Sequence, residues 1–145
     1  MEQPDPRVVP MVREFFEKHL AFNTYLGIQV AELRRGFCRL EIPFRKELVG
    51  DPGRPALHGG VLSSLVDSAG GGAAMSMMDS PNDRVSTIDL RVDYLRPANL
   101  ETVVAEATVS RMGNKVACVD VACFHPDDAQ RLLVTGKTVY NVHRR

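Results

Sequence analysis

The sequence has few cysteines, no net charge and no long apolar run. Its three cysteines, Cys38, Cys118 and Cys123, are odd in number and widely spaced. This pattern fits neither a disulfide framework nor a metal-binding motif. A reducing, cytoplasmic setting is the simplest interpretation, and we expect no metal site and no bound cofactor.

Eighteen basic and eighteen acidic side chains balance to a formal charge of zero. Proteins that bind nucleic acids usually carry a basic excess, so this balance argues against a general nucleic-acid binder. No segment approaches the apolar length that a membrane span requires, and the first six residues contain no apolar signal segment. We therefore expect neither a nucleic-acid nor a membrane partner.

Two spacings of apolar residues alternate along the chain. Helical spacing from Pro10 to about Leu20 predicts an N-terminal helix within an extension, residues 1–22. The same spacing returns from roughly Gly60 to Met78 and predicts one long central helix. Strands are predicted in six runs of residues: Gly27 to Leu33, Phe37 to Phe44, Ile88 to Tyr94, Val103 to Val109, Val116 to Phe124 and Leu132 to Val142.

The connections between the predicted strands are short, which makes neighbouring strands antiparallel. Arg34-Arg35-Gly36, for example, predicts a hairpin turn. With no internal repeat, a chain of 145 residues supports one domain with its own core, spanning residues 1–145. The element order predicts an α+β fold in which a strongly curved sheet of about six strands wraps around the central helix. Such a sheet leaves its edges available for a second subunit.

The start of the central helix is the most informative segment. His58-Gly59-Gly60 opens it, and Asp67 is a lone carboxylate on its otherwise apolar or small-residue surface. A helix N-terminus presents unpaired N–H groups and partial positive charge, so it can hold a carbonyl oxygen that becomes negative during acyl transfer. Asp67 follows His58 by nine residues, about two and a half turns, so it faces away from its own helix N-terminus. We infer that the donor and the carboxylate come from two copies of the chain.

Gly70-Gly71-Gly72 stands in the middle of this predicted helix. Each glycine costs about 1 kcal/mol of helix stability relative to alanine. Close approach of a second backbone or of a ligand usually offsets such a loss. We expect the triplet to serve helix packing across a dimer.

Together these features resemble the hotdog-fold acyl-CoA thioesterases, in particular the phenylacetate-pathway (PaaI-like) type. The resemblance is carried by the run Leu57 to Leu62, by Asp67, and by the run Thr87 to Ala98, which ends in Tyr-Leu-Arg-Pro-Ala. In element order it covers roughly Gly27 to Val142. It implies a homodimer whose two sheets join into one, usually paired again into a homotetramer, with active sites at the dimer interface.

The resemblance also implies roles for single residues. The backbone N–H of Gly59 matches the donor to the thioester oxygen, and His58 beside it orients the turn. Asp67 matches the acidic residue that acts as general base or nucleophile from the other subunit. Thr87 falls where family members often place a Ser or Thr that orients the attacking water. The family often has an asparagine six residues before the histidine, where this sequence has Pro52.

Four further residues are predicted to contact the substrate. Gly60 continues the unobstructed backbone of the turn. Arg96, Arg111 and Lys115 also fit ordinary surface charges, but they are candidates for the phosphates of coenzyme A, because arginine offers bidentate contacts and lysine a point charge. Coenzyme A is expected only as part of the substrate.

We therefore expect an enzyme that hydrolyses an acyl- or aryl-CoA thioester to the free acid and CoA. Two alternatives stay open. A hotdog hydratase or dehydratase needs a histidine paired with an acid for proton transfer at carbon, which the His-Gly-Gly-to-Asp spacing fits less well. A non-catalytic acyl-CoA-binding module could discard the carboxylate, yet Asp67 is retained.

Overall fold

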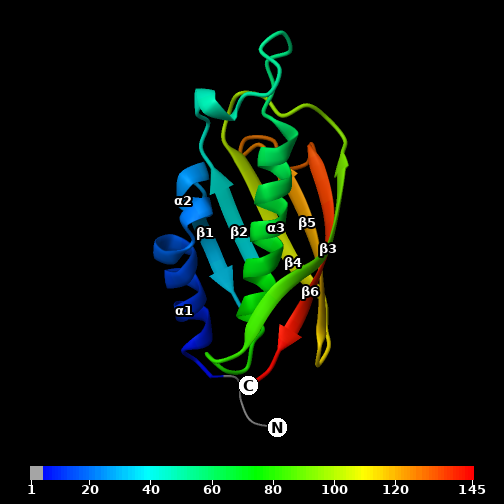
Figure 1. Ribbon diagram of the computed structural model, residues 1–145. Helices are drawn as coiled ribbons and strands as arrows, with labels where there is room; N and C mark the ends of the chain where they lie inside the picture. The colour runs from blue at the N-terminus through cyan, green and yellow to red at the C-terminus, as the bar shows by residue number, and fades with distance from the viewer. Residues whose placement is uncertain (1–4) are drawn as a thin grey trace.

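The computed structural model describes residues 5–145 and shows an antiparallel sheet curved around a long helix (Figure 1). Helix α3 spans Gly59–Ser76. The strands run in the sheet order β1-β2-β4-β5-β6-β3. Their bounds are β1 Gln29–Arg34, β2 Phe37–Ile42, β3 Arg84–Tyr94, β4 Val103–Met112, β5 Val116–Phe124 and β6 Val134–His143. The predicted α+β architecture is confirmed, with six strands and with ends of the central helix within two residues of those expected.

The N-terminal segment is helical, as predicted, but it is divided differently. Helix α1 spans Val8–Glu14, a π-helical turn covers Phe15–His19, and α2 spans Ala21–Leu26. The predicted end at about Leu20 is close, since Leu20 leaves the helical conformation with ψ of 90°. The helix starts two residues earlier than predicted, and α2 was not predicted. Pro10 lies in the first turn of α1, where its missing N–H has no helical acceptor to lose. Residues 1–4 of the predicted extension lie outside the described residues.

Helix α3 lies in the concave face of the sheet and supplies the centre of the core (Figure 1). Leu65, Val66, Ala69 and Ala73 of its predicted apolar stripe are fully buried. They pack with buried side chains of β2, β4, β5 and β6 in one continuous cluster. Within residues 5–145, no helix is both long and apolar enough to cross a membrane.

Strand β3 forms one edge of the sheet and is largely exposed. The predicted alternation holds for Leu90 and Val92, which pack against the core. It fails at Ile88, which is 57% exposed, because the pairing with β6 shifts register between Thr87 and Asp89. A bulge of this kind turns one side chain away from its expected face.

The glycine triplet packs against the sheet of its own chain, so its expected role across a dimer is wrong for two of the three glycines. A methyl group on Gly70 would lie 2.4 Å from Tyr140 Oη and 2.6 Å from Thr138 Oγ1. A methyl on Gly72 would lie 2.7 Å from Cys38 Sγ. These glycines let α3 approach β6 and β2 more closely than any other residue would allow. Gly71 differs, since its nearest contact would be an ordinary 3.8 Å.

We predict that Gly70→Ala destabilises the protein and that Gly71→Ala does not. Gly70→Ala overpacks the contact with Tyr140 and should lower the free energy of unfolding by about 1–3 kcal/mol. Gly71→Ala meets no close contact and should leave it unchanged or raise it by up to about 1 kcal/mol through helix propensity. Urea denaturation of both variants measures the difference, and equal losses would contradict the packing described here.

The cysteines differ in burial, which sets their reactivity. Burial raises the pKa of Cys38 and of Cys123 to about 12, whereas Cys118 is only half-buried. Because the thiolate is the reactive form, Cys38 and Cys123 should resist a thiol reagent in the folded protein. We predict that Ellman's reagent at pH 8 labels about one thiol per native chain and all three after denaturation. Rapid labelling of the native Cys118→Ser variant would contradict this assignment.

Candidate functional site

The backbone N–H groups in the first turn of α3 differ in whether they have a partner. The His58 side chain caps the helix, because its Nδ1 accepts the Gly60 N–H at 2.8 Å. The Val61 N–H donates to the His58 carbonyl at 3.0 Å. Among residues 5–145, the Gly59 N–H donates to no partner. Of the two predicted glycines, Gly59 is therefore the one with a donor available to an oxygen, while the N–H of Gly60 is engaged.

A tyrosine at the end of β3 holds this turn in place. Tyr94 Oη donates to the Gly59 carbonyl at 2.7 Å, and Ser63 Oγ donates to the same oxygen at 3.0 Å. A methyl group on Gly59 would lie 3.3 Å from the Tyr94 ring. The orientation of the Gly59 peptide thus depends on Tyr94 and Ser63. No sequence pattern predicts this role for either residue.

Asp67, the predicted acid, lies in the middle of α3 beside Thr87, which was predicted to orient the attacking water. Thr87 Oγ1 of β3 donates to Asp67 Oδ1 at 2.9 Å. Tyr140 Oη of β6 donates to the Asp67 carbonyl at 2.8 Å and lies 3.4 Å from Oδ1. Burial raises the pKa of Tyr140, so it remains a hydrogen-bond donor. No sequence pattern pointed to Tyr140, because its role arises from a sheet contact 73 residues away.

Within one chain, the Gly59 N–H and the Asp67 carboxylate lie far apart. We call His58, Gly59 and Tyr94 the donor half-site, and Asp67, Thr87 and Tyr140 the acid half-site. Gly59 and Asp67 are eight residues apart on one straight helix, or about 12 Å at 1.5 Å per residue. A thioester carbonyl cannot contact both at once, since the reacting atoms must lie about 3 Å from each.

The predicted basic residues fall in two places. Arg96 borders a hollow of about 370 Å³ beside Gly59 and Tyr94, and its guanidinium donates to the Leu132 carbonyl at 2.7 Å. Arg111 and Lys115 border a second hollow at the turn between β4 and β5. That turn lies at the opposite end of the molecule from the start of α3 (Figure 1). Of these three residues, Arg96 alone borders the hollow beside the donor half-site.

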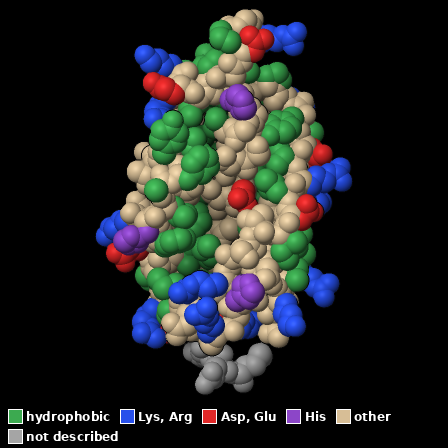
Figure 2. Space-filling view, viewed as in Figure 1, with side chains coloured by type: hydrophobic (Ala, Val, Ile, Leu, Met, Phe, Trp, Pro, Cys, Tyr) green, Lys and Arg blue, Asp and Glu red, His purple; other side chains and the backbone are tan. Residues whose placement is uncertain are grey.

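The face that exposes α3 carries apolar side chains on both sides of its middle and charged side chains at its rim (Figure 2). Figure 2 shows apolar side chains on both sides of this face, an acidic side chain near its middle, and Lys and Arg side chains around its edges. The loop with Pro52 leads into His58, and there the Asp51 carboxylate accepts the Gly53 N–H at 2.9 Å. No amide side chain stands where the family often has one.

The sequence and the fold of this chain have clear relatives. Residues 55–131, more than half of the chain, match the family model described as Thioesterase superfamily. A medium/long-chain acyl-CoA thioesterase, YigI of Salmonella typhimurium, is 32% identical over 94% of both chains. YigI of Escherichia coli is 34% identical over 79% of this chain and 82% of its own.

Solved structures agree with the sequence relatives. A thioesterase family protein from Silicibacter pomeroyi superposes with a TM-score of 0.84 at 26% identity, over 93% of this chain and 97% of its own. The donor half-site turn, α3 and β3 all fall inside the matched residues 55–131. The chain therefore belongs to the thioesterase superfamily, and it is a thioester hydrolase with the hotdog fold.

The Thr87 hydroxyl should support the reaction through Asp67. Thr87→Val keeps the shape but removes the donor to Asp67, and we expect kcat for thioester hydrolysis to fall about tenfold with little change in KM. Thr87→Ser keeps the hydroxyl and should stay within about threefold of the wild-type kcat. Steady-state kinetics of both variants test this. Equal losses in the two variants would assign Thr87 a packing role instead.

Proposed function

We propose that this protein hydrolyses acyl-CoA thioesters at sites shared between two subunits. The thioester carbonyl oxygen accepts a hydrogen bond from the Gly59 N–H of one subunit, where negative charge develops in the transition state. Asp67 of the other subunit deprotonates the attacking water, or attacks the carbonyl itself. Thr87 orients Asp67 and the water. The products are the free acid and coenzyme A.

The separation of the half-sites is the observation that carries this proposal. Each half is built within one chain by short hydrogen bonds, yet the two lie about 12 Å apart along α3. A rigid helix cannot close that distance. A second copy of the chain supplies the missing half without any change in the first.

The edge strand β3 offers the way to bring the halves together. Thr87 near its start contacts Asp67, and Tyr94 at its end contacts Gly59. If two copies of β3 pair antiparallel about a two-fold axis near Leu90, the start of each strand lies beside the end of the other. That pairing sets Thr87 and Asp67 of one subunit beside the partner's Tyr94 and Gly59. It also satisfies the edge groups of β3 that the sheet leaves unpaired.

The substrate class is inferred from the relatives and from the charges near the site. Relatives named medium/long-chain acyl-CoA thioesterases favour a straight acyl chain over the aryl group of the phenylacetate-pathway type. We assign Arg96 to the coenzyme A phosphates on the donor side. Arg111 and Lys115, pairing of dimers into a tetramer, a cytoplasmic location and the need for no cofactor stay predictions from the sequence.

The decisive variant is Asp67→Asn, which keeps the shape of the side chain and removes the base. We expect kcat for octanoyl-CoA to fall at least about 10²-fold while KM changes far less. Asp120→Asn serves as the matched control, because Asp120 is an exposed carboxylate on β5 that pairs with Lys137. Nearly full kcat in Asp67→Asn would refute the mechanism.

Mixed dimers test the sharing of the site. Gly59→Pro removes the oxyanion donor, and Asp67→Asn removes the base, so each homodimer should be inactive. Dimers that carry one subunit of each kind retain one intact site and should recover part of the activity. Sedimentation first establishes that the mixed species is a dimer. If verified mixed dimers stay inactive, the shared geometry is wrong even though the role of Asp67 stands.

A further inference from the structure

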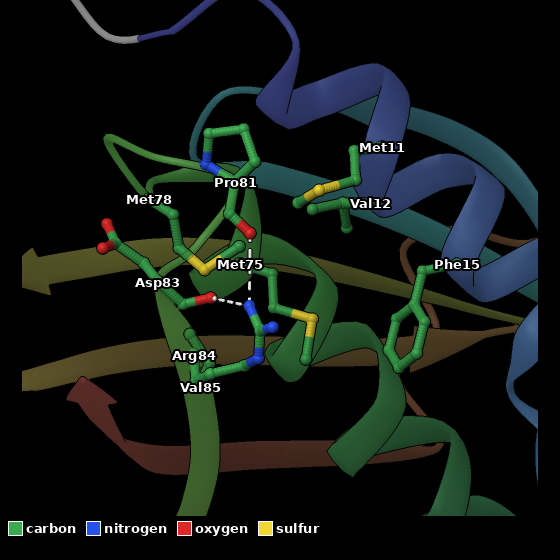
Figure 3. A pocket seen from close by; sticks show the side chains of 9 residues that line it. All are labelled: Met11, Val12, Phe15, Met75, Met78, Pro81, Asp83, Arg84 and Val85. Atoms are coloured by element: carbon green, nitrogen blue, oxygen red, sulfur yellow. Dashed lines mark hydrogen bonds between the residues drawn. The ribbon is translucent and has the colours of Figure 1, made fainter. Parts of the chain in front are cut away.

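A hollow of about 340 Å³ opens at the other end of α3, between the N-terminal helices and the start of β3 (Figure 3). Met11, Val12 and Phe15 border it from the N-terminal segment, Met75 and Met78 from the end of α3, and Val85 from β3. For comparison, an apolar cavity of about 150 Å³ holds a benzene molecule. The hollow is therefore large enough for a chain of more than six carbons.

The polar groups at this hollow are already paired. Arg84 Nη1 donates to the Asp83 carbonyl at 2.9 Å and to the Pro81 carbonyl at 3.2 Å, both drawn as dashed lines in Figure 3. The buried Asp83 carboxylate accepts the N–H groups of Asp79 and Ser80. The rest of the lining is apolar side chain, and it favours a hydrocarbon over a polar ligand.

On the face of α3 between the acid half-site and the hollow stands a buried residue without a side chain, Gly71. Asp67, Gly71 and Met75 are spaced by four residues and share one face of α3. Gly71 is the one glycine of the triplet that its own sheet does not require, since an added methyl would find only Tyr140 Cε1 at 3.8 Å. On β3, Thr87 and Val85 are two residues apart and point to the same side.

The distances suit an acyl chain of medium length. From Asp67 to Met75 the path runs about 12 Å along the helix, and from Thr87 to Val85 about 7 Å along the strand. With C–C bonds of about 1.5 Å, an extended alkyl chain advances about 1.3 Å per carbon. Carbons beyond about the fifth enter the hollow, and about nine carbons reach Met75.

We propose that this hollow holds the distal part of the substrate's acyl chain, which passes over Gly71 from the thioester at Asp67. The inference rests on the function proposed above and names the part of the protein that sets chain length. Met11, Val12 and Phe15 lie outside the residues 55–131 that match the superfamily model. The N-terminal helices thus supply one side of the hollow, and Met75 and Val85 of the matched region supply the other.

The test measures kcat/KM for butyryl-, octanoyl-, decanoyl- and lauroyl-CoA. Each buried methylene should raise kcat/KM up to about fourfold until the hollow is full. Gly71→Val obstructs the path and Met75→Trp fills the hollow. Either variant should lose at least about 30-fold for decanoyl-CoA and stay within about threefold for butyryl-CoA. Met77→Trp is the matched control, because Met77 is also half-buried but does not border the hollow.

The outcomes separate this inference from the proposed function. A wild-type protein that hydrolyses none of these esters refutes the proposed function, and the inference falls with it. A wild type that hydrolyses them, with both variants keeping its chain-length profile, refutes only the inference. Loss of dimer and of butyryl-CoA hydrolysis in Gly71→Val, with Met75→Trp unchanged, would assign Gly71 to the subunit interface and also overturn it. Two variants are used so that the test stays valid if one of them fails to fold. Circular dichroism detects such a failure.

Discussion

The close packing of α3 against its own sheet is the constraint on which the candidate site depends. Gly70 lies against Tyr140 and Thr138 of β6, and Gly72 against Cys38 of β2, at distances that no side chain permits. This packing fixes the distance between α3 and the sheet. It therefore also fixes the position of the Asp67 backbone next to the Tyr140 hydroxyl. The low helix propensity of the glycines is offset by this burial. The geometry of the acid half-site and the packing of the core are thus set by the same contact.

A rigid helix has a second consequence, since it fixes the distance between its own N-terminus and Asp67. The donor half-site is tied to the end of β3 through Tyr94, and the acid half-site to its start through Thr87. Both halves are therefore anchored to one strand at the edge of the sheet. An edge strand with unpaired backbone groups favours association, and in this fold association would complete the chemistry. Dimer stability and activity would then depend on the same surface.

Features that depend on periodicity could be predicted from the sequence, whereas features that depend on tertiary packing could not. Period-two and helical spacing located α3 and all six strands, because one face of each is buried. The bulge at Ile88 and the contacts of Gly70 depend on neighbours distant in sequence, so no local pattern marks them. At the site, Gly59, Asp67 and Thr87 carry a recognisable motif. Tyr140 does not, because a tyrosine in a strand is an ordinary core residue until the sheet places it under Asp67.

In the proposed reaction, the two ends of α3 serve different parts of the substrate. Its first half carries the groups that any thioester needs, namely an oxyanion donor and a carboxylate, and these are independent of the acyl group. Its last turn meets α1 and the start of β3, where apolar side chains of several sizes can line a hollow. Changing those side chains alters the hydrocarbon that fits without moving Asp67, since Gly70 and Gly72 hold the helix between the two regions. Specificity can therefore change while the reacting groups stay in place.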